Sequence, residues 1–198
     1  MPLTDGPLWT RQRQLAANAL PLAVLVAGIV WAVVMDRAGA VHAQSLVVAG
    51  GGAVAAWVTV GLFGLWDNGR LKHEMGRRWH EAHGFDRTEK YFVGCARPAY
   101  RGLLDPHEDV GWLVLHDDKV EFFGSLLNLS MDKVDVGQVV RRPNPHSWLG
   151  LGGWISLEGQ TADRSLRLLV EIREARTLWG NVLASRRLLV RLREWRKA

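Results

Sequence analysis

The sequence predicts an α+β protein in which two long apolar helices precede an antiparallel sheet, with one further helix at the C-terminal end. Three observations lead to this prediction. Two uncharged apolar runs, 21 and 22 residues long, lie in the first third of the chain. After Lys90, apolar and polar residues alternate in short segments, which is the period of strands. After Arg173, apolar residues recur at the period of a helix.

Apolar and charged residues are unevenly placed along the chain. It has 198 residues, 48% of them apolar, and a net charge of +5. Only two charged residues fall between Leu15 and Trp66, whereas residues 67–198 contain 22 Lys and Arg against 18 Asp and Glu. This division excludes both a uniformly soluble globule and a transporter built from many membrane helices. A single cysteine, Cys95, excludes a disulfide framework and a cysteine-based zinc finger.

The two apolar runs are expected to form a transmembrane hairpin over residues 15–66, with helices at 15–35 and 45–66. A helix of 21 residues rises about 30 Å, which is the thickness of the hydrocarbon core of a bilayer. Because only nine residues, 36–44, separate the runs, the two helices must be antiparallel neighbours.

Small residues recur every four positions along both runs, and this spacing lets helix backbones approach closely in lipid. On the first run they are Ala19, Ala23 and Ala27. On the second they are Gly52, Ala56 and Gly64, with Val60 at the position between the last two. The hairpin itself can use both stripes, and we expect this internal packing. A partner helix in the membrane is the alternative.

Basic residues flank the hairpin unequally. The connecting loop contains only Arg37, whereas six lie beyond the other ends of the runs: Arg11, Arg13, Arg70, Lys72, Arg77 and Arg78. Because Lys and Arg accumulate on the cytoplasmic side, we expect a multi-pass protein of the cell (inner) membrane with both termini in the cytoplasm. A signal peptide cleaved near Ala43 is an alternative for the first run, but the run is too long and charged residues precede the cleavage site.

Three further segments are expected outside the hairpin. Residues 1–14 would be a cytoplasmic N-terminal segment, 67–90 a juxtamembrane connector and 91–198 a cytoplasmic domain. In the connector, an apolar helical period is weakened by three glycines. We expect this connector to lie along the membrane surface, with Trp66 and Trp79 at the depth of the lipid headgroups.

About seven strands are expected in the C-terminal domain, at residues 91–96, 111–116, 119–123, 126–131, 134–142, 152–158 and 165–172. The second and third form a hairpin, because the two-residue turn Asp117-Asp118 separates two apolar-rich runs. The final helix carries an apolar stripe that includes Leu178, Val182, Leu189 and Leu192.

Residues 111–124 and 127–134 carry a resemblance to a known family. In that family a hairpin of the form G-x-L-x-L-T-x-x-x-L-x-F precedes a strand ending I-x-L-x-D-I. Here His116 stands in place of the Thr, and Val134 in place of the final Ile. Residues 91–198 thus resemble the pleckstrin-homology (PH) superfold in its bacterial, GRAM-like form. The resemblance implies a strongly bent PH-like antiparallel sheet or open barrel, with one end plugged by the C-terminal helix and no enzymatic activity.

The nearest approach to a metal motif is His80-Glu81-Ala82-His83, with His73 seven residues before His80. The zinc hydrolase motif needs two histidines four residues apart and a glutamate directly after the first, so this spacing is one residue short. Histidines of a juxtamembrane segment explain the pattern better. We expect no metal site and no cofactor.

Polar side chains cluster in the loops of the C-terminal domain, at Asp105, His107, Glu108, Asp109, Asp117 and Asp118. A catalytic triad with Ser125 or Ser130 would need a nucleophile elbow, which neither serine has. We expect these side chains to be solvated in loops and turns. The glycine-rich segment 150–153 lacks the Lys-Ser/Thr pair of a phosphate-binding loop. No catalytic residue is expected, and the protein is not expected to be an enzyme.

The C-terminal helix is strongly basic. Its candidate binding residues for a lipid or a partner are Arg186, Arg187, Arg191, Arg193, Arg196 and Lys197. Solvation accounts for part of this charge. Beside an anionic leaflet, however, each surface cation contributes on the order of 1 kcal/mol to binding. The expected partners are therefore the bilayer and an anionic phospholipid or membrane protein, but not nucleic acid.

These features predict a membrane-anchored, non-enzymatic binding or scaffolding protein. Its cytoplasmic domain would recognise anionic lipid headgroups or a protein partner. The alternative is an accessory subunit of an integral membrane complex, for transport or envelope synthesis, assembled through the transmembrane helices.

Overall fold

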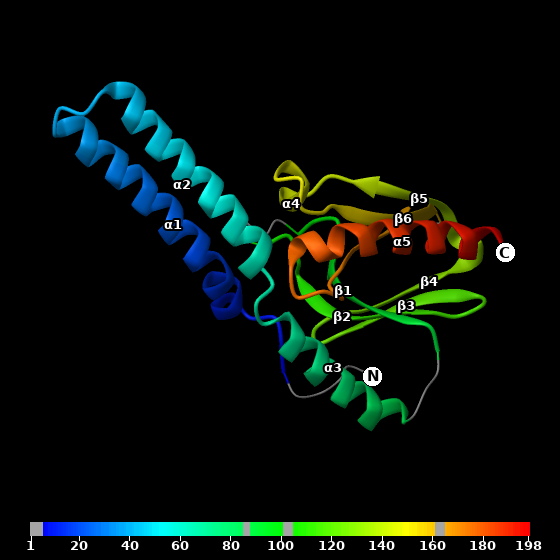
Figure 1. The fold of residues 1–198 in the computed structure, drawn as a ribbon. Helices are drawn as coiled ribbons and strands as arrows, with labels where there is room; N and C mark the ends of the chain where they lie inside the picture. The colour runs from blue at the N-terminus through cyan, green and yellow to red at the C-terminus, as the bar shows by residue number, and fades with distance from the viewer. Residues whose placement is uncertain (1–5, 85–87, 101–104, 161–164) are drawn as a thin grey trace.

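The computed structural model describes residues 6–84, 88–100, 105–160 and 165–198. Two antiparallel helices, α1 (Arg11–Arg37) and α2 (His42–Phe63), extend from one side of a sheet domain (Figure 1). We call this pair the hairpin; its tip is the turn at residues 38–41, and its base is the end where α1 begins and α2 ends. With the sheet and a C-terminal helix, it confirms the predicted α+β fold.

Both helices of the hairpin are long and apolar enough to cross a membrane. They meet at Gly28 and Gly52, where a Cβ atom on Gly28 would lie 2.7 Å from the Cα of Gly52. Ala56 is buried, as predicted. Gly64, by contrast, does not serve the hairpin crossing; it lies against Leu178 of the C-terminal helix.

The predicted contact stripe on α1 is wrong. Its members are all exposed: Ala19, Ala23 and Ala27. The buried residues of α1 are instead Ala17, Pro21 and Ala32. Small residues four positions apart occur on more than one face of this helix, so the spacing alone could not select the face that meets α2.

The sheet has seven antiparallel strands in the order β4-β3-β2-β1-β7-β6-β5. They are β1 (Lys90–Ala96), β2 (Asp109–Leu115), β3 (Lys119–Gly124), β4 (Asn128–Asp132), β5 (Val136–Arg142), β6 (Trp154–Gln160) and β7 (Ser165–Ile172). Strands β1–β4 and β5–β7 form two meanders, which the pairing of β1 with β7 joins into one sheet. Each predicted strand is present, with its ends moved by a few residues.

The sheet bends around helix α5 (Leu178–Lys197), which lies across its concave side (Figure 1). Leu192 and Trp195 of this helix are at most 4% exposed. They share one hydrophobic cluster with residues from both meanders, such as Phe122 and Leu157. Burial of this cluster is the largest apolar contribution to the sheet domain.

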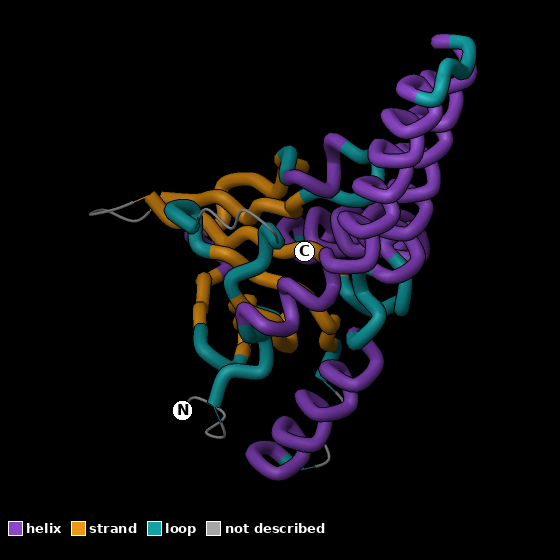
Figure 2. Tube along the Cα trace, turned by 90° about the vertical axis from the view of Figure 1, so that its left-hand side faces the viewer, coloured by secondary structure: helices purple, strands orange, loops and turns teal. Residues whose placement is uncertain are grey.

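Helix α3 (Asn68–His83) covers the opposite face of the sheet at β1 and β2. In Figures 1 and 2, α3 leads away from the base of the hairpin in the direction opposite to the tip. The expected connector therefore packs on the sheet domain. Trp79 is only 4% exposed, and its ring lies 5.2 Å from that of Phe123 rather than among headgroups. The reason is that all seven residues of β2 are buried, so both of its faces need a cover.

Residues 6–10, which we call the N-terminal strap, pack into the same hydrophobic cluster as α3. Leu8 and Trp9 are buried there, and the Leu8 amide donates to Ser125 Oγ at 3.1 Å. Arg78 Nη1 donates to the carbonyl oxygen of Gly6 at 3.1 Å. The hairpin is thus inserted between two segments of one cluster, the strap and α3.

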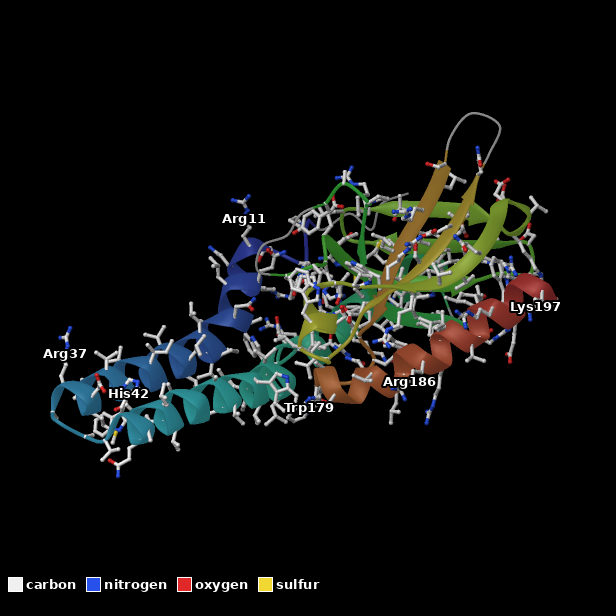
Figure 3. The ribbon with its side chains drawn as sticks, turned by 90° about the horizontal axis from the view of Figure 1, so that it is seen from above. Arg11, Arg37, His42, Trp179, Arg186 and Lys197 are labelled. Atoms are coloured by element: carbon white, nitrogen blue, oxygen red, sulfur yellow. The ribbon has the colours of Figure 1, made fainter. Side chains whose placement is uncertain are left out.

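The base of the hairpin also contacts α5 and the loop after α4 (Pro145–Trp148). The Trp179 indole lies over Gly61, where a Cβ atom would be 2.7 Å from the ring, and its centroid is 5.3 Å from that of Trp57 (Figure 3). Trp57 Nε1 donates to the carbonyl oxygen of Leu149 at 2.8 Å. These contacts fix the hairpin against the sheet domain.

Candidate functional site

Three of the six predicted binding residues on α5 bond to the sheet domain. Arg191 Nη2 lies 2.6 Å from Glu89 Oε2, and this ion pair lowers the pKa of Glu89 and raises that of Arg191. Arg193 Nε donates to the carbonyl oxygen of Val139 at 3.0 Å. Arg196 donates to a backbone carbonyl of β5. These three cations fasten α5 to the sheet.

The other three predicted residues, Arg186, Arg187 and Lys197, are exposed and form no hydrogen bond or ion pair with the described part of the chain. The Arg186 side chain projects away from the sheet, and Lys197 lies at the end of α5 remote from the hairpin (Figure 3). At 1.5 Å per residue, Arg186 lies about 12 Å and Lys197 about 28 Å along the helix from its first residue. Arg186 and Arg187 are therefore the predicted cations that are both free and near the hairpin.

A second group of ionisable residues, three of them buried and His146 partly buried, lies where the loop before β2, helix α4 and the end of β7 meet. We call Asp105, His107, His146 and Glu171 the buried cluster. His107 Nδ1 lies 2.7 Å from Asp105 Oδ1, and its Nε2 lies 3.1 Å from Glu171 Oε2. His146 Nδ1 is 2.9 Å from the same Glu171 oxygen. One carboxylate oxygen thus faces two imidazole rings.

Two glycines make room for the buried cluster. A Cβ atom on Gly94 of β1 would lie 2.0 Å from the His107 ring, and one on Gly152 would lie 1.9 Å from Glu171 Oε1. Any larger residue at either position would displace the ring or the carboxylate. The Gly153 amide donates to Glu171 Oε1 at 2.8 Å, so the glycine-rich segment 150–153 holds a carboxylate of the protein itself.

Charges within the buried cluster outweigh the cost of burial. Burial raises the pKa of Glu171, but the neighbouring His146 and His107 hold it well below its usual value. Burial likewise raises the pKa of Asp105, which His107 and Arg173 then lower below its usual value. Burial lowers the pKa of His107, but the stronger effect of Asp105 and Glu171 raises it above its usual value. These neighbours therefore favour the ionised form of both carboxylates.

Arg173 connects the buried cluster to α3 and to the N-terminal strap. It is 1% exposed, its Nε donates to Asn68 Oδ1 at 3.0 Å, and its guanidinium lies 4.3 Å from the Trp9 ring centroid. Burial lowers the pKa of Arg173, whereas the Asp105 and Glu171 charges raise it. This arginine balances one of the two carboxylate charges.

The expectation that the polar loop before β2 is solvated is wrong for three of its residues. Asp105, His107 and Asp109 are buried. Asp109 accepts hydrogen bonds from Ser125 Oγ at 2.6 Å and from the Leu127 amide at 2.9 Å, so it closes the turn between β3 and β4. Ser125 is thus a structural donor. The turn residues Asp117 and Asp118 are exposed, as predicted.

A repeated tripeptide is the sequence signal for the buried cluster. Asp105-Pro106-His107 and Asn144-Pro145-His146 have the same Asx-Pro-His pattern. The Asp105 carboxylate accepts from the His107 amide at 2.7 Å, and the Asn144 side chain caps α4 by accepting from the Ser147 amide at 2.9 Å. In both cases the Asx side chain turns the backbone and the third residue places an imidazole beside Glu171.

A cleft of about 780 Å³ adjoins the buried cluster. Asn144 and Trp154 belong to the walls of both. Asn144 Nδ2 donates to Glu171 Oε2 at 2.8 Å, and the Trp154 ring lies 5.3 Å from the His107 ring. The other residues that line the cleft include Tyr100, Arg142, Trp148 and Arg167. The cleft therefore meets the cluster through Asn144 and Trp154, and none of the four cluster residues lines it.

The histidines that the sequence places nearest to a metal motif are spread over an exposed surface of α3. His73 and His80 are exposed, and His83 stacks on Trp79 with ring centroids 4.0 Å apart. Within the described residues, His107, His146 and Glu171 form the group whose ligand atoms lie together, all within 4.8 Å of one another.

Comparison with known proteins gives no relative. No family model, no curated protein and no solved structure matches the chain. By its fold, the protein is an α+β sheet domain that carries two helices long and apolar enough to cross a membrane.

Proposed function

We propose that this protein is a membrane-anchored, non-enzymatic binding or scaffolding protein of the inner membrane, with both termini in the cytoplasm. Its sheet domain would be a PH-like, GRAM-like module that binds anionic lipid headgroups through the first half of α5. The observation that carries the proposal is the packing of Trp179 on Gly61, which starts α5 at the base of the hairpin. Arg186 and Arg187 then lie within about three helical turns of that point.

Exposed apolar side chains beside the same junction support this orientation. Trp148 is 81% exposed, Leu183 60% and Trp66 56%. Tryptophan favours the interface between lipid and water, because its ring is apolar and its N–H is polar. Arg11 and Arg13 lie at the base of the hairpin, as the positive-inside bias requires for a cytoplasmic domain. A surface of tryptophans and cations suits the headgroup layer.

The test uses the full chain in lipid nanodiscs, with a fluorophore on Val190→Cys of α5. Val190 is 52% exposed, and Cys95, the one native cysteine, is fully buried. A nitroxide on the lipid headgroups would quench the fluorophore. We expect stronger quenching with phosphatidylglycerol than with phosphatidylcholine alone, and a loss of the difference at high salt, since exposed charges are screened over about 10 Å at 0.1 M.

Arg186→Gln/Arg187→Gln should remove most of that difference, because each cation contributes on the order of 1 kcal/mol beside an anionic leaflet. The matched control is Lys133→Gln/Lys197→Gln, which removes the same charge near the far end of α5, where Lys133 lies over the Trp195 ring. Equal quenching of the wild-type protein in both lipids would overturn lipid binding and favour a protein partner.

The second candidate is an accessory subunit of an integral membrane complex, and the exposed stripe of α1 favours it. Ala19, Ala23 and Ala27 are not used by the hairpin, so their small side chains remain available to a neighbouring helix in the membrane. Affinity purification in mild detergent tests this function. A stoichiometric integral partner that is lost from Ala23→Ile, but kept by the lipid-binding variant Arg186→Gln/Arg187→Gln, would support the subunit.

A further inference from the structure

We propose that His107 Nε2, His146 Nδ1 and Glu171 Oε2 form a binding site for one divalent transition-metal ion, of the class that takes imidazole and carboxylate ligands. The three atoms come from the loop before β2, from α4 and from β7, and all lie within 4.8 Å of one another. Two imidazoles and one carboxylate are a common ligand set for Zn²⁺ and for Fe²⁺.

The spacing of the ligand atoms fits a metal centre. Glu171 Oε2 lies 3.1 Å from His107 Nε2 and 2.9 Å from His146 Nδ1. For bonds of about 2.0–2.1 Å, neighbouring ligand atoms are about 2.9 Å apart in an octahedral site and about 3.3 Å apart in a tetrahedral one. Both separations from Glu171 Oε2 fall in this range.

His107 Nε2 is the strongest single indication. This nitrogen is buried and makes no aligned hydrogen bond with the described residues, although Glu171 Oε2 is 3.1 Å away. A buried polar atom without a hydrogen bond is costly, and such an atom suggests a missing partner such as an ion or water. A metal ion between Nε2 and the carboxylate would give this nitrogen a partner.

Groups around the ligands have the arrangement of an outer shell. Asp105 Oδ1 accepts from His107 Nδ1 at 2.7 Å, which fixes the ring and leaves Nε2 for the metal. The Gly153 amide holds the other oxygen of Glu171, at 2.8 Å. Gly94 and Gly152 leave space that a Cβ atom would fill. Carboxylate–histidine pairs of this kind orient metal ligands and tune their basicity.

Charged groups and a cleft adjoin the ligands. The site holds two buried carboxylates, Asp105 and Glu171, and one buried guanidinium, Arg173. Buried carboxylates are normally paired with cations or coordinate a metal ion. Asn144 and Trp154, which line the adjoining cleft, lie between that cleft and the ligands.

The test measures Zn²⁺ binding by the full chain in detergent micelles, purified without a histidine tag and stripped with a chelator. Isothermal titration should give one Zn²⁺ per chain, and Co²⁺ should give visible absorption bands of a nitrogen- and oxygen-ligated ion. His146→Gln removes a ligand whose side chain is 12% exposed, so this variant should fold. We expect its Zn²⁺ affinity to fall by at least about 100-fold, and that of Asp105→Asn by roughly 10–100-fold.

His80→Gln is the matched control, because it removes an exposed histidine from α3, where the sequence comes nearest to a metal motif. Its Zn²⁺ affinity should equal that of the wild type. Zn²⁺ should also raise the melting temperature of the wild type and of His80→Gln, but not that of His146→Gln. The proposal is overturned if the wild type binds no Zn²⁺ or Co²⁺ at one ion per chain, or if His146→Gln binds as tightly as the wild type. If Asp105→Asn fails to fold, the Co²⁺ spectra of the wild type and of His146→Gln still decide the question.

Discussion

Single residues inside the sheet domain carry charges that only their neighbours make tolerable. Glu171, near the end of β7, is 2% exposed, and Arg173, directly after β7, is 1% exposed. Each finds partners from distant segments, Glu171 from α4 and Arg173 from α3. Removing one partner of such a buried pair costs about 3–5 kcal/mol, because the other charge is left without compensation. The buried cluster therefore constrains the fold whether or not it holds a metal ion.

Phe122 tests the core at the scale of one side chain. It is fully buried between the two meanders and α5. We expect Phe122→Ala to destabilise the protein by about 3–5 kcal/mol, from lost apolar burial and the cavity left behind. Thermal unfolding followed by circular dichroism measures this. Leu126→Ala, at a residue 53% exposed, is the control and should change the stability little; equal effects of the two substitutions would contradict the core packing.

Glu158 gives a pH-dependent prediction. Hydrogen bonding to Arg142, chiefly, lowers the pKa of Glu158 from 4.5 to about 2. A lowered pKa stabilises the folded state above the unfolded-state pKa, and this stabilisation is lost as the pH falls from 4.5 toward 2. The melting temperature of Glu158→Gln should therefore fall less over this window than that of the wild type. Parallel decreases in both proteins would show that the ion pair does not contribute.

Helices in this protein divide their faces between partners. On α5, Leu192 and Trp195 pack against the sheet, and Trp179 packs against Trp57 of the hairpin. Arg186 projects into solvent (Figure 3). The cations of this helix consequently have two roles. Arg191 ties the helix to Glu89, whereas Arg186 and Arg187 remain free. A count of basic residues along the helix cannot separate these roles.

The hairpin crossing gives a prediction at the scale of helices. Gly52→Leu should force α1 and α2 apart, because a Cβ atom there would lie 2.8 Å from the Cα of Gly28. Overpacking of this kind costs about 1–3 kcal/mol. Thermal loss of helical circular dichroism in detergent measures it. Gly51→Leu is the matched control, since nothing lies within 4 Å of its Cβ position. Equal stabilities of the two variants would show that the helices do not cross at Gly52.

At the scale of the whole molecule, the hairpin is an insertion into the sheet domain. The strap enters the hydrophobic cluster beside β2, the chain leaves through α1 and α2, and α3 returns to the same cluster (Figures 1 and 2). Arg13 pairs with Asp67 at 3.3 Å across the base of the hairpin. The position of the domain relative to the hairpin is therefore set by packing on both sides of the insertion.

Truncation tests this arrangement. A fragment of residues 67–198 keeps α3, whereas one of residues 91–198 uncovers Phe92, Trp112 and Val114. We expect the longer fragment to be monomeric and to unfold cooperatively, and the shorter one to associate through the uncovered apolar face. Sedimentation velocity distinguishes these outcomes. Two equally monomeric, equally stable fragments would show that α3 is dispensable and that the domain begins at residue 91, as the sequence predicts.

The sequence by itself determined the hairpin, the seven strands and the apolar stripe of α5, because each depends on a local period of apolar residues. Tertiary structure alone decided which face of α1 meets α2, since small residues recur on several faces. It also decided that α3 covers β2, because β2 is apolar on both sides. The buried cluster shows the same limit most clearly. Asp105-Pro106-His107 and Asn144-Pro145-His146 are visible in the sequence, but their rings gain a common partner only when β7 brings Glu171 between them.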